Sequence, residues 1–364
     1  MCPRKFEVAG MNKLTTKMKT MKKTTKVNTF TYALVIIAYL VIELLLNRNM
    51  LSRSTQGQLV PICAYIVMAL SLNLVVGVSG ELSLGHAGFM SVGAFSGVIA
   101  AVSLEGMIGS PILRLVIAMV VGAALAAVAG FIVGVPALRL QGDYLAIVTL
   151  AFGQIIVNIL QCVYVGVDAA GLHFNFLDPD LHMTDGTSIM SGPKGTVSVT
   201  KISSFTAGVV LILVALFVVL NLVNSRSGRA IMAVRDSRIA AESVGINVTK
   251  YRLMAFVTAA ALAGAAGALY GLNYSSIAPI KFDYNQSILI LVFVVLGGLG
   301  NMWGSIIAAA FLTILPEAMR GFEDYRMLVY AIVLILVMLA TNNDTVKGLA
   351  ARIIPKRKGG ADNG

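Results

Sequence analysis

Two glycine-rich stretches, at residues 77–88 and 297–304, interrupt apolar segments of the chain. They read GVSGELSLGHAG and GGLGNMWG. Glycine in a helix interior costs about 1 kcal/mol relative to alanine, so each cluster predicts a break or very close packing. A broken helix exposes backbone N–H and C=O groups, which an apolar environment tolerates only beside a polar cavity. We favour a solute path for the first stretch and a tight turn for the second. Turns or close helix packing remain the alternative for the first.

Several residues in and near the first stretch are candidates to line such a path. They are Asn73, Gly80, Ser83, Gly85, His86, Gly88, Thr149 and Gln154. Gln154 shares one helix face with Asn158 and Gln161, at spacings of four and three. That face must look at protein or water, so contact between helices and cavity lining both stay open. His86 has no second histidine nearby in sequence, which favours a structural hydrogen bond over chemistry.

A second candidate site is the polar loop at residues 225–252, which carries six of the 28 Lys and Arg residues. Asp236 or Ser237 can cap a helix at 238–244, and Gly245 can end it in the left-handed conformation. The charged and apolar residues of the loop separate onto two sides. Arg235, Arg238 and Glu242 lie on one, and Ile231, Val234, Ala241 and Val244 on the other. Such a helix either lies among lipid headgroups or docks on a partner.

Other chemistries lack their residues. No charged residue is predicted at the middle of an apolar segment, since Glu43, Glu81, Asp143 and Glu317 all lie near segment edges. Proton- and sodium-driven carriers usually need such a group. There is no GxxxxGK[ST] phosphate loop, so any ATP would be bound by another chain. The three cysteines show no metal-ligand spacing. We expect no metal, no cofactor and no enzyme activity.

The elements that must position these residues are membrane helices. The chain is 57% hydrophobic and 12% charged, with a mean hydropathy of +0.85. Period-two alternation is absent, which excludes a barrel and predicts an all-α, polytopic integral membrane protein of eight to ten spans. The candidate spans are 30–46, 58–78, 82–104, 111–135, 143–164, 204–224, 253–274, 287–300, 303–318 and 326–340. Rows of small residues in 253–274, such as Ala260, Gly264 and Ala268, predict close helix packing.

The distribution of positive charge predicts the orientation. Segments 1–29, 225–252 and 341–364 carry 19 of the 28 Lys and Arg residues. Positive charge is retained in the cytoplasm, so both termini and the central loop should be inside and the 165–203 loop outside. Segments 1–29 and 341–364 are then cytoplasmic tails around a transmembrane domain at 30–340. The basic first tail is expected to be disordered against anionic lipid. The net charge of +11 therefore needs no nucleic acid.

The chain resembles the permease subunits of branched-chain amino-acid ABC importers, of the LivM type. Five stretches carry the resemblance and lie between about 58 and 340. They are SLNLVVGVSGELSLGHAGFMSVGA (71–94), LRLQGDYLAIVTLAFGQII (138–156), SRSGRAIMAVRDSRIAAESVGINVTKYRL (225–253), ILVFVVLGGLGNMWGSIIAA (290–309) and LPEAMRGFEDYRMLVYA (315–331). The outer loop departs from the family pattern, with MSGPKGT at 190–196 in place of a TGGPxGI run.

The resemblance implies a multi-pass subunit of a bacterial cytoplasmic membrane. It implies a heterodimer with a LivH-like permease, two cytoplasmic ABC ATPase subunits and an extracytoplasmic substrate-binding protein. The 225–252 loop would dock on an ATPase through Arg235, Asp236, Arg238, Ala241, Glu242 and Gly245. The expected solutes are leucine, isoleucine and valine. Alternatives are an ABC permease for urea, short amides or sugars, and, from another class, a stand-alone carrier or channel.

Overall fold

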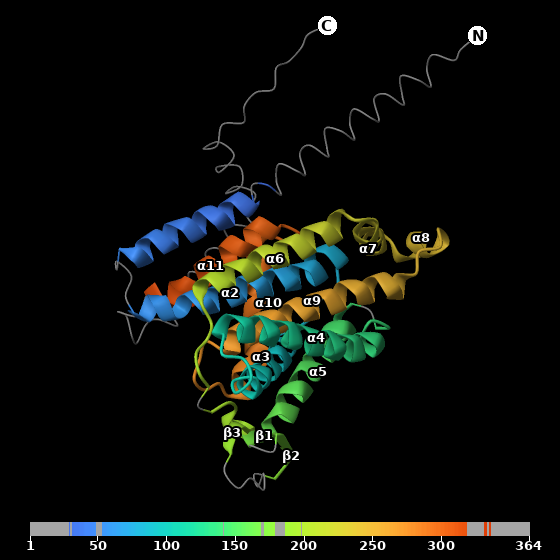
Figure 1. Cartoon of the computed structure of the whole chain (residues 1–364). Helices are drawn as coiled ribbons and strands as arrows, with labels where there is room; N and C mark the ends of the chain where they lie inside the picture. Colours follow the sequence, from blue (N-terminus) through green and yellow to red (C-terminus); the bar gives the residue numbers. More distant parts are fainter. Residues whose placement is uncertain are drawn as a thin grey trace, which may run out of the picture.

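The protein is an almost entirely helical bundle with one small β-sheet (Figure 1). The computed structural model describes residues 29, 31–48, 53–140, 142–168, 171–178, 186–197, 199–318, 331, 332 and 335. Within them, seven helical segments are long and apolar enough to cross a membrane, and Thr31–Asn47 and Met302–Glu317 are shorter apolar helices. These nine segments match the first nine predicted spans. The tenth, 326–340, lies almost wholly outside the described residues, as do the two predicted tails.

The helices follow one another in the order of the predicted spans. After the first helix, Thr31–Asn47, they are α2 (Arg53–Asn73), the π-helix η1 (Leu74–Ser79), α3 (His86–Ser103), α4 (Pro111–Ala137), α5 (Asp143–Gln161), α6 (Phe205–Asn224), α7 (Arg226–Asp236), α8 (Arg238–Ser243), α9 (Val248–Gly271), the 3₁₀ turn η3 (Pro279–Phe282), α10 (Tyr284–Gly297) and α11 (Met302–Ala318).

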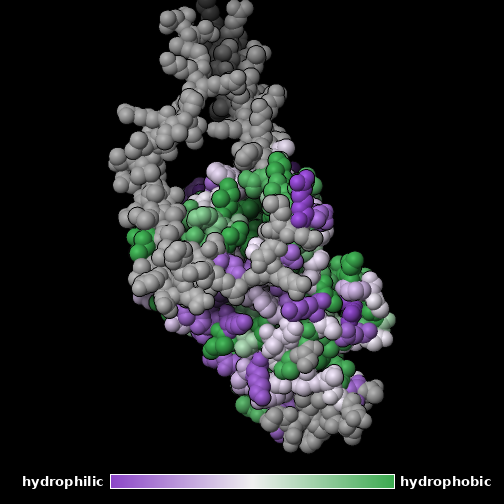
Figure 2. All heavy atoms as spheres, turned by 90° about the vertical axis from the view of Figure 1, so that its left-hand side faces the viewer, coloured by the Kyte–Doolittle hydropathy of each residue, from purple (hydrophilic) through white to green (hydrophobic). Residues whose placement is uncertain are grey.

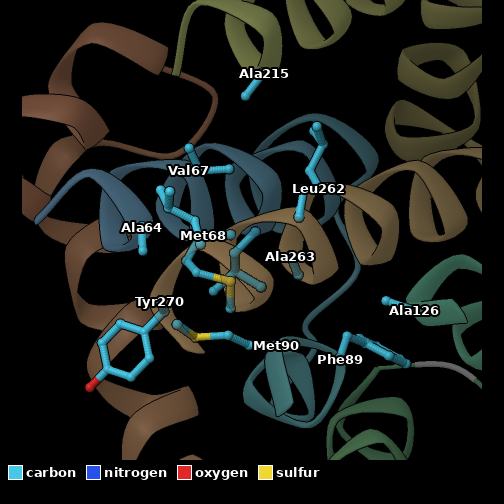
Figure 3. Close-up of a cluster of buried hydrophobic side chains, with 14 of the residues drawn as sticks. Ala64, Val67, Met68, Phe89, Met90, Ala126, Ala215, Leu262, Ala263 and Tyr270 are labelled. Atoms are coloured by element: carbon cyan, nitrogen blue, oxygen red, sulfur yellow. The ribbon is translucent and has the colours of Figure 1, made fainter. Parts of the chain in front are cut away.

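Helices α2, α3 and α9 form the centre of the bundle. Met68 of α2, Met90 of α3 and Ala263 of α9 are completely buried and lie together in Figure 3. Small residues let the backbones approach: a Cβ at Gly264 of α9 would collide with backbone of Gly122 in α4. Because lipid is as apolar as leucine, such close packing is a principal attraction between membrane helices. The packing role predicted for the small-residue rows is confirmed.

The outer helices present apolar side chains to their surroundings. Ile112, Val120 and Ile132 of α4, and Ile147 of α5, are largely exposed, as expected of helices that face lipid. An apolar cavity of about 330 Å³ lies between the helix Thr31–Asn47 and α2, α6 and α11. Figure 2 shows hydrophobic and hydrophilic side chains interspersed on one end face of the molecule, around a hollow with hydrophobic walls.

The two ends of the bundle differ. One end, here called the sheet end, carries strands β1 (Val163–Asp168), β2 (Gly171–Phe176) and β3 (Thr187–Ser191). β1 lies in the middle and pairs antiparallel with both neighbours. Helices α7 and α8 lie at the other, loop end, where η1 meets the turn between α10 and α11. The predicted 165–203 loop is thus partly a sheet, which the hydropathy pattern did not predict.

Candidate functional site

The first glycine-rich stretch is a genuine break between two helices. Helix α2 widens into the π-helix η1, which ends at Gly80 with a left-handed φ of 75°. Residues 80–85 have no helical structure, and α3 begins only at His86. The second stretch is a tight turn in which Gly298 and Gly300 have φ of 93° and 79°. The expected break and the expected turn are both confirmed.

The turn packs directly onto the broken helix. A Cβ at Gly77 would collide with Asn73 Oδ1 and with the Gly300 backbone. Asn73 accepts a hydrogen bond from Gly300 N at 2.8 Å and donates to Ser305 Oγ at 2.9 Å. It also donates to the Asn301 carbonyl at 3.2 Å. Both hydrogens of the Asn73 amide are therefore used inside the chain.

Side chains from other helices satisfy backbone groups freed by the break. Leu84 N donates to Thr149 Oγ1 at 3.1 Å, and Ala87 N donates to Ser287 Oγ at 3.1 Å. The first bond ties the break to α5 and the second ties the start of α3 to α10. Glycines allow this proximity, because a Cβ at Gly85 would collide with the Thr149 carbonyl and one at Gly88 would lie 2.8 Å from Gly153 Cα. The break is thus enclosed by α5 and α10.

Two polar atoms inside the break remain available. His86 Nε2 lies 2.7 Å from Ser71 Oγ, which confirms the expected structural hydrogen bond. His86 Nδ1 and Ser83 Oγ are buried, and neither has a hydrogen-bond partner among the described residues. Buried polar groups are normally paired with protein or water. These two atoms are therefore hydrogen-bonding groups that a water or a polar solute group would satisfy.

The remaining candidate, Gln154, is less buried than Ser83, Gly85 and His86. It is half-buried on α5, and Asn158 on the same face is exposed. An exposed asparagine in a membrane helix must meet water or another polypeptide rather than hydrocarbon. Asn158 is therefore directed away from this chain, whereas Gln154 is partly covered by it.

The polar loop folds as two helices rather than the single one predicted. Ser225 caps α7 by accepting a hydrogen bond from Gly228 N at 3.1 Å, and Ser237 caps α8 through Ala240 N at 3.3 Å. Ser237, not Asp236, is therefore the cap. Gly245, two residues after α8, has the expected left-handed φ of 81°. The sequence missed α7 as a separate helix, although the Ser225 cap was a signal for it.

A small second core holds this loop in place. Val234 of α7, Ala241 of α8 and Val248 of α9 are buried together, with Ile246 packed against them. The expectation that Val244 shares this buried face is wrong, because the residue is 73% exposed. Helix α8 ends at Ser243, one residue earlier than predicted, and the chain then turns away toward Gly245. Val244 and Ile239, which is 82% exposed, both face outward.

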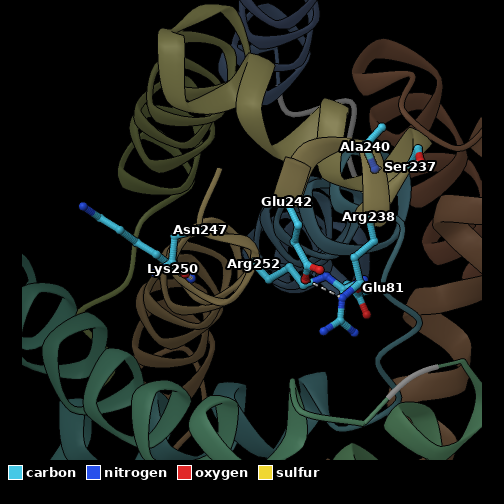
Figure 4. A network of polar contacts seen from close by, with 8 residues as sticks. All are labelled: Glu81, Ser237, Arg238, Ala240, Glu242, Asn247, Lys250 and Arg252. Carbon is cyan, nitrogen blue, oxygen red and sulfur yellow. Dashed lines mark hydrogen bonds and ion pairs between the residues drawn. The ribbon is translucent and has the colours of Figure 1, made fainter. Parts of the chain in front are cut away.

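The charged residues of the loop do not form one outward-facing row. Arg238 and Glu242 form a partly exposed ion pair of 3.0 Å, and both side chains point from α8 toward Glu81 and Arg252 (Figure 4). Arg235 instead reaches back to η1, where Nη1 donates to the Gly77 carbonyl at 3.0 Å. Asp236 holds the same guanidinium through Nε and Nη2, at 3.2 and 3.0 Å. Asp236 therefore orients the Arg235 guanidinium that binds η1.

A buried ion pair completes this connection. Arg252 Nη2 of α9 lies 2.7 Å from Glu81 Oε1, directly after η1, and both side chains are largely shielded from solvent (Figure 4). Burial raises the pKa of Glu81 above its usual 4.5, while the positive charges of Arg252 and Arg238 lower it. Sequence analysis missed Arg252, Ser71 and Ser287. Only the opposite charges at two span edges hinted at the Glu81–Arg252 pair.

Comparison with known families and proteins agrees with this architecture. Residues 54–338 match the family described as "Branched-chain amino acid transport system / permease component". The chain belongs to this permease family. Membership and the apolar helices make it a multi-pass membrane protein with a transport role.

Several curated permeases are similar to this one. The LivM permease protein of the high-affinity branched-chain amino acid transport system of Escherichia coli K12 is 34% identical over 302 residues, covering 80% of this chain and 69% of that protein. A probable LivM of Methanocaldococcus jannaschii is 27% identical, covering 66% and 74%. The E. coli ribose import permease RbsC is 26% identical, covering 76% and 81%. No solved structure matches.

Proposed function

We propose that this permease is one membrane half of an ATP-driven importer of leucine, isoleucine and valine. A binding protein would deliver the amino acid at the sheet end, and ATPase subunits would act at the loop end. The similarity to LivM supports the solute. Similarity to LivH, at 25% identity over 76% of this chain, supports a second permease half of that kind.

The outward face of α8 is the proposed ATPase-docking surface. Ile239 and Val244 expose apolar side chains beside the Arg238–Glu242 pair. The Val234, Ala241 and Val248 core holds α8 against α7 and α9. A rigid apolar surface with a charged rim suits a protein partner. Arg235, Asp236, Ala241 and Gly245 would support this surface from behind, and Arg238 and Glu242 would meet the ATPase.

The solute path is proposed to run past the break. Gly80, Ser83 and Gly85 lie in the break, and His86 and Gly88 lie in the first turn of α3. Thr149 borders the break, and Asn73 ties its loop end to the α10–α11 turn. The free Ser83 Oγ and His86 Nδ1 would offset part of the desolvation of a zwitterion, which cannot enter hydrocarbon unaided. Gln154 and Asn158 on α5 would line the side shared with the second permease half.

The sheet end is proposed to receive the binding protein. Leu172 and Phe174 of β2, and Leu177 after it, are more than half exposed. An orientation with the loop end in the cytoplasm and the sheet end outside agrees with the positive charge of residues 225–252. An apolar pocket separates solutes differing by one methylene by only about 1–3 kcal/mol, so tight selection would reside in the binding protein.

The observation that carries this proposal is the family match combined with a structured, outward-facing α8. The test is uptake of labelled leucine by vesicles that contain this chain with its co-purifying subunits. Uptake should require ATP and stop when the ATPase subunits cannot hydrolyse it. Leucine uptake that persists without hydrolysis, or by this chain alone, would instead identify a stand-alone carrier or channel.

Sugar transport is the second candidate, because ribose and fructose import permeases are each 26% identical to this chain. Competition separates the candidates. Unlabelled isoleucine or valine should suppress leucine uptake, whereas ribose, fructose and urea should not. Suppression by a sugar or by urea alone would reassign the solute.

A further inference from the structure

The loop that carries α8 is connected to the broken helix by two separate polar contacts, from different helices. Arg235 of α7 binds the Gly77 carbonyl, and Arg252 of α9 binds Glu81. Gly77 and Glu81 lie on either side of Gly80, the left-handed residue at which η1 ends. Arginines from the 225–252 region therefore hold the chain on both sides of Gly80.

The π-helix explains why Gly77 can bind Arg235. The last carbonyls of any helix lack partners within it, and η1 ends two residues after Gly77. A positive group is favoured there because the carbonyl end of a helix carries partial negative charge. Arg235 supplies that group, and Asp236 fixes the plane of its guanidinium.

The contact is also steric. A Cβ at Gly80 would lie 2.5 Å from Arg235 Cγ, so the aliphatic part of Arg235 rests on the Gly80 backbone. The Arg235 side chain is 40% exposed and that of Asp236 is 68% exposed, and exposed ion pairs of this kind add little stability. The Arg235 contacts therefore contribute little to the free energy of unfolding, and their main effect is to fix the position of η1 relative to α7.

Glu81 and Arg252 hold the other side. Their 2.7 Å pair is shielded, and Arg252 Nε is buried with no hydrogen-bond partner among the described residues. Helix α9 is also where Val248 anchors α7 and α8. A displacement of the loop would thus move Arg235 and Arg252 together relative to η1.

We propose that Arg235 and the Glu81–Arg252 pair are positioning residues that pass movement of the α7–α8 loop to the break at Gly80. This inference rests on the proposed function, since it assigns how the ATPase-docking loop acts on the solute path. The predicted defect of their loss is uncoupling: ATP is still hydrolysed, but the break no longer follows the loop.

The test measures leucine transported per ATP hydrolysed in the complete importer. Arg235→Met and Glu81→Gln should assemble and hydrolyse ATP, while the transport ratio falls about tenfold, within the range of allosteric coupling energies. Arg235→Lys should recover part of the ratio, because an ammonium can still donate to Gly77. Arg229→Met is the matched control, since Arg229 lies exposed on the same helix and donates to the nearby Asn224 carbonyl at 3.3 Å rather than to η1. It should transport normally.

Three outcomes would contradict the positioning role of Arg235 and the Glu81–Arg252 pair. In the first, Arg235→Met keeps the full transport ratio. In the second, Arg229→Met lowers the ratio as much as Arg235→Met does. In the third, ATP hydrolysis and transport fall together and the ratio stays unchanged. If the single variants do not assemble, the double variant Glu81→Arg with Arg252→Glu distinguishes the two roles. A positioning role predicts that both assembly and the transport ratio recover. A purely structural role predicts that assembly alone recovers. Failure of the unmodified chain to bind any ATPase would instead refute the proposed function.

Discussion

Asn73 Oδ1 accepts a hydrogen bond from Gly300 N at 2.8 Å, across 227 residues of sequence. The same side chain donates to Ser305 Oγ, so one buried amide joins α2 to the turn between α10 and α11. The loop end of the broken helix is therefore fixed by a side chain of α2 and by backbone in the turn.

Replacing Asn73 by leucine should destabilise the protein. The change leaves Gly300 N and Ser305 Oγ with fewer partners, and an unsatisfied buried polar group costs about 1–3 kcal/mol. Thermal unfolding of the purified protein in detergent should show a lower midpoint. Asn224→Leu, at an exposed position at the end of α6, is the control and should change it little. Equal midpoints for both variants would show that the Asn73 bonds contribute nothing.

Close packing of α9 should make Gly264 intolerant of a methyl group. A Cβ there would collide with Gly122 backbone and Ala126 Cβ, so α4 and α9 must separate, at about 1–3 kcal/mol for overpacking. Gly264→Ala should therefore lower folding yield and unfolding temperature. Gly57→Ala provides the contrast, because nothing lies within 4 Å of its Cβ and alanine favours helix. A neutral Gly264→Ala would mean that α4 and α9 are farther apart.

Gly245 should be replaceable only by residues that accept a positive φ. Its φ is 81°, and nothing lies within 4 Å of a Cβ, so the penalty is conformational and about 1–2 kcal/mol for most residues. Gly245→Val should weaken ATPase retention on the purified permease by distorting the end of α8. Gly245→Asn should retain it, since asparagine visits this conformation. Equal ATPase retention by the two variants would show that the conformation of Gly245 does not affect docking.

Acid should act on coupling through Glu81. Burial raises its folded-state pKa above the usual 4.5. Between these two values the folded chain binds more protons than the unfolded chain, so the contribution of Glu81 to the free energy of unfolding increases as pH falls. The same protonation discharges the Glu81–Arg252 pair. The number of leucines transported per ATP should therefore decline as the pH falls between the two pKa values of Glu81. Protonation of Glu81 should not lower the free energy of unfolding in that pH range.

Glu81→Gln is the reference for that pH series, because it resembles the protonated acid at every pH. Its transport ratio should be low and should lack this decline. A variant whose ratio follows pH just as the unmodified protein does would show that another group is responsible.

The sequence predicted the features that depend on neighbouring residues. Nine spans followed from hydropathy, and the break and the turn followed from clustered glycines. Ser237 and Gly245 located α8 to within one residue at its C-terminal end. Contacts between distant residues could not be read in the same way. Arg235 was expected on one side of the loop with Arg238 and Glu242, but it binds Gly77, which is 158 residues away. A backbone carbonyl carries no sequence signal of its own.

The outer loop shows a second limit of sequence reading. Its strands are five or six residues long, and β2 has much of its surface exposed. Short strands with one solvated face give a weak alternation that apolar spans on both sides obscure. Val244 was misplaced for a related reason: helical spacing assigns a face only while the helix continues, and α8 ends at Ser243.

The most direct test of the account is photo-crosslinking from α8 in native membranes. A photoreactive amino acid at Ile239, which is 82% exposed, should form a covalent product with an ATPase subunit. The same probe at Ile280, exposed in η3 near the sheet end, should not. Products containing only lipid at Ile239, with the importer otherwise intact, would contradict the claim that this helix is where the ATPase acts.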